Sequence, residues 1–127
     1  MSKCAIYCRV STDNQEREGT SLQTQLDGCL TYCQKQGYTV FHRFVGSESG
    51  LILDQPMRNE LRELVRNKQI DVVVVYCLDR LSRDPTHGSI LLDELEKYGV
   101  KLEGVTEDIE NSDLGRLISY IRGFASK

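Results

Sequence analysis

Short apolar runs alternate with amphipathic segments along the whole chain. The first run, residues 3–10, has the length and apolar content of a buried strand. A second strand is predicted over 38–45 and a fourth over 100–106. The third, over 70–77, is continuous and rich in β-branched residues, which is typical of a central parallel strand covered on both faces.

The segments between these strands have helical spacing. Thr20 and Gln23 have the pattern of an N-cap and capping box, and Gly37 is expected to end the helix that follows. The predicted inner stripe of this helix consists of Leu22, Leu26, Cys29, Leu30 and Cys33. Pro56 suits the first turn of a second helix. The side chains of this helix that are expected to point into the core are those of Leu61, Leu64 and Val65.

A third helix is predicted over 86–98 and is expected to end at Gly99. The last segment begins near residues 111–112 and shows no stop signal before Lys127. Its apolar stripe consists of Leu114, Leu117, Ile118, Ile121 and Phe124. The alternation predicts one domain over residues 1–127, an α/β three-layer sandwich around a mostly parallel sheet of four or five strands. We expect the last helix, and the natural chain, to continue further.

The composition is that of a globular domain. Of the 127 residues, 39% are hydrophobic, which is enough for one core. No apolar run reaches the length of a membrane helix, and the start lacks a signal-peptide pattern. The five cysteines include no CxxC pair. We interpret them as small packing residues in a reducing cytoplasm, since Cys4 and Cys8 share a strand face and Cys29 and Cys33 share a helix face.

The charge balance is acidic. The net charge is −3 and the pI is about 5.4, whereas a stand-alone nucleic-acid binder ordinarily has a large basic excess. If this domain acts on DNA, another segment must supply most of the phosphate neutralisation.

Nucleophilic and cationic residues follow two of the predicted strands. Arg9 and Ser11 lie at the end of the first strand, and Arg80 and Arg83 follow the third. The carboxyl ends of parallel strands are where sites form in such sheets. A serine hydroxyl among arginines suits attack on a phosphate, because the guanidinium fork matches phosphate oxygens and stays charged. From position alone, however, Ser11 is more typical of a cap or turn residue, and no histidine lies close in sequence to serve as its base.

Two stretches resemble the motifs of serine recombinases of the resolvase and invertase superfamily. Residues 7–15 (YCRVSTDNQ) resemble the nucleophile motif, and residues 76–84 (YCLDRLSRD) resemble the second motif. Residues 19–25 (GTSLQTQ) are similar to the helix start of the large integrase and transposon branch. The similarity covers essentially the whole chain, in order and with matching spacing.

The resemblance implies a mechanism. Ser11 attacks a DNA phosphodiester and forms a 5′-phosphoserine link, and after strand exchange the released 3′-hydroxyl reseals the DNA. No metal or other cofactor is required, because the phosphoserine stores the bond energy. The residues that match the family's site are the phosphate-binding Arg9, Arg80 and Arg83, the carboxylate Asp79 and the glutamines Gln15 and Gln25.

The resemblance also implies partners. Double-stranded DNA is expected to be bound mainly by a region C-terminal to this domain. The helix that begins near residues 111–112 would start the dimer interface, and two homodimers would join in a synaptic tetramer. Packing of the same stripe onto the domain's own sheet is an equally good interpretation for its first two turns.

Two positions depart from the family pattern. An acid expected near Gly46 and an arginine expected near Gln55 are missing. Glu48 and Arg58 are the candidates to replace them, and we expect reduced activity or a locally rearranged site.

Two other functions are compatible with the residues alone. The first is a non-catalytic phosphate-binding or interaction module, which would tolerate Ser11→Ala. The second is a flavodoxin-like enzyme acting on a soluble phosphate ester, which would need a metal-binding carboxylate cluster where the chain offers Asp79 and Asp84.

Overall fold

The described part of the chain is built on one parallel sheet of four strands. The computed structural model describes residues 2–10, 21–47, 56–78, 81, 85–106, 109 and 116–121. The strands are β1 (Lys3–Val10), β2 (Thr39–Ser47), β3 (Val72–Val75) and β4 (Lys101–Gly104). They lie in the order β2-β1-β3-β4, and every pairing is parallel. The predicted α/β class with a parallel sheet is confirmed.

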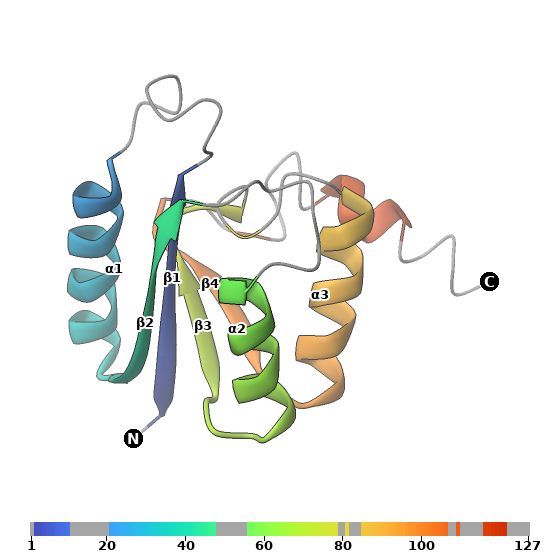
Figure 1. Cartoon of the computed structure of the whole chain (residues 1–127), viewed down its shortest axis with the longest axis horizontal. Helices are drawn as coiled ribbons and strands as arrows, with labels where there is room; N and C mark the ends of the chain where they lie inside the picture. Colours follow the sequence, from blue (N-terminus) through green and yellow to red (C-terminus); the bar gives the residue numbers. More distant parts are fainter. Residues whose placement is uncertain are drawn as a thin grey trace.

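Helices cover both faces of the sheet. Figure 1 shows α1 (Leu22–Gln36) on one face and both α2 (Pro56–Arg66) and α3 (Pro85–Lys97) on the other. The three layers are therefore those predicted. Each helix follows a strand and runs back along it, so that the helix N-termini and the carboxyl ends of the strands lie at the same edge.

Several predicted boundaries were wrong. The fourth strand, predicted over 100–106, is the shorter Lys101–Gly104, because its pairing with β3 ends at Gly104. Ser21, not Thr20, is the N-cap of α1, because its side chain accepts a hydrogen bond from the N–H of Thr24. The second strand does not end at residue 45 but continues to Ser47 beside β1. The third strand is shorter than 70–77, since pairing with β1 ends at Val75 and the chain then bends away. The predicted end of α1 at Gly37 is confirmed by its left-handed φ of 76°.

Strand β1 divides the core into two clusters. Ala5 and Tyr7 point to the α2–α3 side, whereas Cys4, Ile6 and Cys8 point to α1. The five cysteines are thiols and not disulfides, and four of the five are buried between β1 and α1. They are packing residues, as predicted.

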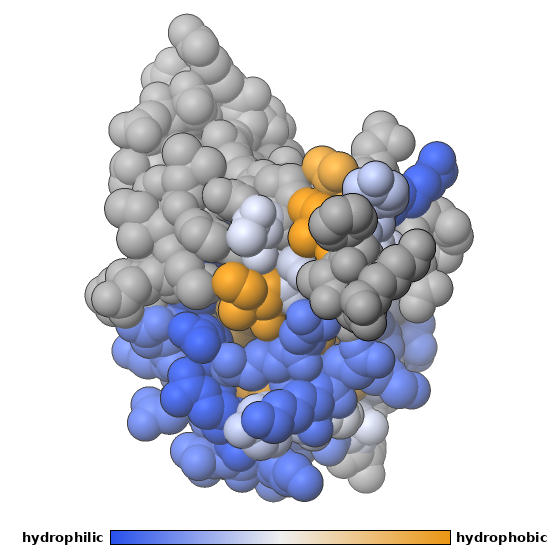
Figure 2. All heavy atoms as spheres, turned by 90° about the vertical axis from the view of Figure 1, so that its right-hand side faces the viewer, coloured by the Kyte–Doolittle hydropathy of each residue, from blue (hydrophilic) through white to orange (hydrophobic). Residues whose placement is uncertain are grey.

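In the described part of the last helix, residues 116–121, some apolar side chains are buried and others are exposed. Ile118 is buried in the α2–α3 core, whereas Leu117 and Tyr120 are 46% and 71% exposed. Figure 2 shows apolar surface on this side of the molecule above a hydrophilic lower half. Packing on the domain's own core is thus confirmed for Ile118, and Leu114 and Phe124 lie outside the described residues. No helix among the described residues is long and apolar enough to cross a membrane.

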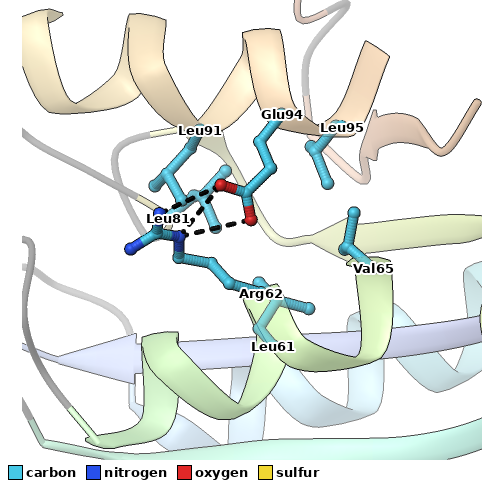
Figure 3. Close-up of a pocket in the computed structure, with 7 residues that line it drawn as sticks. All are labelled: Leu61, Arg62, Val65, Leu81, Leu91, Glu94 and Leu95. Carbon is cyan, nitrogen blue, oxygen red and sulfur yellow. Dashed lines mark hydrogen bonds and ion pairs between the residues drawn. The ribbon is translucent and has the colours of Figure 1, made fainter. Parts of the chain in front are cut away.

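An ion pair joins α2 to α3. Glu94 Oε2 lies 3.0 Å from Arg62 Nη2, and Glu94 Oε1 lies 3.4 Å from Arg66 Nε. Figure 3 shows this pair beside an apolar cavity of about 10 Å³, barely the space that one water molecule requires. The cavity is a packing gap between helices, and the ion pair closes its polar side.

Replacing Glu94 with Gln tests this pair. We expect the free energy of unfolding at pH 7 to fall by about 1 kcal/mol, because the Glu94 side chain is only 16% exposed and contacts two guanidinium groups. Burial raises the pKa of Glu94, but hydrogen bonds and charge from Arg62 and Arg66 outweigh it and hold the pKa below its usual 4.5. The stabilisation by the ionised Glu94 is therefore fully present above pH 4.5, and it is lost as the pH falls through the lowered pKa of Glu94.

Urea unfolding of the wild type and of Glu94→Gln, at pH 7 and in steps below pH 4.5, measures the effect. Glu63→Gln removes an exposed carboxylate of α2 and serves as the control, with an expected change below about 0.5 kcal/mol at pH 7. A difference between wild type and Glu94→Gln that persists unchanged into acid would contradict the assignment.

Candidate functional site

The predicted site residues belong to the carboxyl edge of the sheet. The structure describes two of the seven, Arg9 at the end of β1 and Gln25 in α1. It also describes Gly46 and Arg58, the two positions linked to the departures from the family pattern. The predicted residues that lie outside the described part of the chain are Ser11, Gln15, Asp79, Arg80 and Arg83, together with Glu48 and Gln55.

Arg9 is fully buried at the end of the central strand β1. Side chains alternate along a strand, so Arg9 points to the same side as Tyr7, toward α2 and α3. A buried guanidinium keeps its charge and is strongly attracted to an anion that reaches it. The arrangement therefore places a fixed positive charge two residues before Ser11.

Gln25 holds the backbone of Arg9 with both ends of its amide. The N–H of Arg9 donates to Gln25 Oε1 at 3.1 Å, and Gln25 Nε2 donates to the carbonyl of Arg9 at 3.0 Å. Both residues are fully buried. Sequence reasoning assigned Gln25 to the site through the family motif alone and left it out of the inner stripe of α1. Its spacing of four and eight residues from Cys29 and Cys33 was the signal that could have placed it there.

The amide of Gln25 lies where β3 would pair with Arg9 if β3 continued beyond Val75. The N–H and the carbonyl of Lys3 both form hydrogen bonds with Asp71, which lies just before β3. Because backbone orientation repeats every two residues along a strand, the N–H and the carbonyl of Arg9 also point to the β3 side. The last residue of β3 in register with β1 is Val75, opposite Tyr7. Because β3 has ended, the side chain of Gln25 satisfies peptide groups that would be left without partners.

Small residues allow α1 to come this close to the sheet. A Cβ atom at Gly28 would lie 3.0 Å from Cε1 of Tyr76, so the helix backbone rests almost directly on that ring. Further along the same face, Cys33 Sγ lies 3.3 Å from Cys4 Sγ. Burial and the hydrogen bond with Cys4 raise the pKa of Cys33 to about 12. These thiols therefore stay protonated, and neither is an activated nucleophile.

Gly46 lies beside Arg9 in the sheet. The two residues are register partners, and a Cβ atom at Gly46 would contact the sulfur of Met57 at 3.5 Å, an ordinary van der Waals distance. A side chain at this position would thus point to α2, on the same face as Arg9. The acid expected near this position by family resemblance is absent, and the backbone accepts a Cβ atom here without a clash.

Arg58 is the second fully buried arginine at this edge. Its Nη2 donates to the carbonyl of Leu81 at 2.8 Å. Sequence reasoning did not foresee this contact, because nothing in the spacing pairs the first turn of α2 with a residue 23 positions later. Among the described residues, no cluster of three or more His, Cys, Asp or Glu side chains could hold a metal ion.

Comparison with protein families agrees with this arrangement. The family described as "Resolvase, N terminal domain" matches residues 4–126. A putative DNA recombinase of Bacillus subtilis (strain 168) is 36% identical over 124 residues, covering 97% of this chain and 24% of that protein. The Tn917 transposon resolvase of Enterococcus faecalis is 32% identical over 121 residues, covering 94% of this chain and 58% of that protein. This chain therefore spans only part of the length of these relatives.

Solved structures with the same fold include two catalytic domains. The N-terminal catalytic domain of TP901-1 integrase has a TM-score of 0.78 at 33% identity, covering 98% of this chain and 96% of that one. The C-terminal catalytic domain of ISC1926 TnpA, an IS607-like serine recombinase, has a TM-score of 0.72 at 28% identity, covering 98% and 84%.

Replacing Gln25 with Leu tests the two hydrogen bonds to Arg9. Leucine keeps most of the volume but offers no partner to the N–H and carbonyl of Arg9. We expect the free energy of unfolding to fall by roughly 2–4 kcal/mol, because each buried peptide group left without a partner costs about 1–3 kcal/mol. Urea unfolding measures this loss, and hydrogen exchange of the Arg9 amide should become faster.

Gln34→Leu is the matched control, because Gln34 is exposed on the same helix. We expect it to change the free energy of unfolding by less than about 0.5 kcal/mol. Equal losses in the two variants would show that the Gln25 amide does not hold the end of β1.

Proposed function

Because this chain belongs to the resolvase family of serine recombinases and matches the family's N-terminal domain, we propose that it cuts and rejoins DNA through Ser11. The reaction is a phosphoryl transfer from DNA to the serine and back. The proposed catalytic domain comprises residues 1–127, and its DNA-binding region lies C-terminal to them.

The proposed reaction proceeds in two exchanges. Ser11 Oγ attacks the phosphorus of a phosphodiester and loses its proton, while the bond from phosphorus to the 3′-oxygen breaks and that oxygen gains a proton. The 5′-phosphate is then esterified to Ser11. In the reverse exchange a 3′-hydroxyl attacks the phosphoserine, which restores the phosphodiester and frees the serine. One P–O bond forms for each that breaks, so neither exchange needs an outside energy source.

The observation that carries the proposal is the buried arginine at the end of β1. Arg9 is fully buried, its backbone is fixed by Gln25, and Ser11 follows it by two residues. A preorganised cation stabilises charge that develops on a phosphate in the transition state without reorganisation. We propose that Arg80 and Arg83 contribute further charge, and that Asp79 and Gln15 support the site with Gln25.

The proposed partners are double-stranded DNA and further copies of the chain. The acidic balance, a net charge of −3, favours DNA binding mainly outside this domain. Leu117 and Tyr120, exposed on the helix at 116–121, are apolar surface suited to a homodimer interface. Two such homodimers would form the synaptic tetramer.

Ser11→Ala distinguishes this proposal from a non-catalytic module. We expect the variant to fold like the wild type and to form no covalent adduct with DNA, because no hydroxyl is left to attack the phosphorus. Full-length protein is incubated with a DNA substrate that carries the recombination site, and adducts are separated on a denaturing gel. Thr31→Ala removes an exposed hydroxyl of α1; it is the control and should form adducts at the wild-type rate.

Adducts that persist in Ser11→Ala would assign the nucleophile elsewhere. If neither the wild type nor any variant forms an adduct with a substrate that it binds, the non-catalytic module becomes the better account.

Gly46→Asp tests the missing acid. The backbone at Gly46 has room for a side chain, and a carboxylate there would lie on the same face as Arg9. We expect this variant to form adducts several-fold faster than the wild type, because it supplies the acid that the family pattern places near this position. Gly46→Asn has nearly the same shape without the charge and should not accelerate the reaction. Equal rates for Asp, Asn and wild type would show that the acid is dispensable in this chain.

A further inference from the structure

A second buried cation accompanies Arg9 at the carboxyl edge of the sheet. The largest fully buried side chains among the described residues are those of Arg9 and Arg58. Arg9 lies in β1, two residues before Ser11, whereas Arg58 lies in the first turn of α2. Arg58 therefore reaches the site region from a separate element.

An arginine at this position is unfavourable for the helix by itself. The N-terminal end of a helix carries a partial positive charge, which repels a cation in the first turn. Moving a guanidinium out of water adds a further cost, which an aliphatic residue packed in the same core would avoid. A fully buried arginine here is best explained by a contact that an aliphatic side chain cannot make.

The contact is made to the backbone of Leu81. Arg58 Nη2 donates to the Leu81 carbonyl at 2.8 Å, and the N–H of Leu81 donates to the carbonyl of Leu78 at 3.0 Å. The side chain of Leu81 is 1% exposed and lies between α2 and α3, as Figure 3 shows. Leu81 is thus held at its carbonyl, its N–H and its side chain.

Leu81 lies within the second family motif, residues 76–84. Arg80 precedes it directly, and Arg83 follows two residues later. A chain fixed at Leu81 limits where these two arginines can lie, because each is joined to it by one or two peptide units. The pairing of β3 with β1 ends at Val75, before this segment begins.

We infer that Arg58 is a positioning residue of the recombination site. It fixes the backbone of Leu81 and thereby sets Arg80 and Arg83 against the phosphate that Ser11 attacks. The inference rests on the proposed function. It assigns to Arg58 a role through the backbone of the second motif and not a direct contact with DNA.

Arg58→Met tests the role, because methionine fills the core but cannot donate to the Leu81 carbonyl. We expect the single-turnover rate of adduct formation, per folded full-length protein at saturating DNA, to fall roughly ten- to a hundredfold, as for catalytic groups displaced by about 1 Å. The Kd for DNA should stay unchanged. Arg58→Lys retains one donor at a similar reach and should restore part of the rate.

Arg62→Met is the matched control. Arg62 lies one turn further along α2 and contacts Glu94 instead of the motif backbone. We expect it to lower the melting temperature while leaving the rate per folded molecule unchanged. If Arg58→Met does not fold, Arg58→Lys compared with Arg62→Lys decides in the same way, since only the former should slow the reaction.

The remaining outcomes overturn the inference. Equal rates for the Arg58 and Arg62 variants would leave Arg58 a purely structural residue. A weaker Kd for DNA that accounts for the whole loss would make it a phosphate-binding residue. In both cases the wild type still forms adducts and Ser11→Ala does not, so the proposed function stands. If the wild type formed no adducts, the result would instead contradict the proposed function itself.

Discussion

The two hydrogen bonds between the Gln25 amide and the backbone of Arg9 are the interaction on which this edge of the protein depends. A parallel sheet normally satisfies the peptide groups of a central strand from both sides. Here β1 extends to Val10 while the paired part of β3 ends at Val75, opposite Tyr7. The side chain of Gln25 replaces the missing strand at Arg9. The end of β1 therefore keeps a strand's rigidity although one neighbouring strand has ended.

The early end of β3 has a structural advantage for a site. Beyond the paired part of β3, Leu78 and Leu81 are buried in the α2–α3 core. A strand that continued in the sheet would instead hold these residues at strand spacing from β1. The same geometry requires α1 to approach closely enough for a glutamine side chain to reach the strand. Gly28 and the buried cysteines meet that requirement because they are small.

The sequence predicted the layers well and the site only in outline. The apolar runs and the glycine helix ends identified the parallel sheet and its helices, because burial on two faces leaves a direct hydrophobic pattern. The end of β3 could not be predicted from its composition, since Tyr76 and Cys77 are as suited to a strand as Val75 is. The roles of Gln25 and Arg58 in holding backbone groups depend on distances between helices and strands. Such distances are set by packing, which a periodic pattern does not encode.

The two buried side chains Gln25 and Arg58 act in complementary ways on opposite layers. Gln25 comes from α1 and fixes the end of β1, before Ser11. Arg58 comes from α2 and fixes Leu81, within the second motif. Each donates a hydrogen bond to a backbone carbonyl next to or within a family motif. A neutral amide suffices at β1, because both a donor and an acceptor are needed there. At Leu81 only a carbonyl must be held, and a cation forms the stronger hydrogen bond to it. The positive charge this adds to the edge also favours an anionic substrate, in a domain whose net charge is otherwise negative.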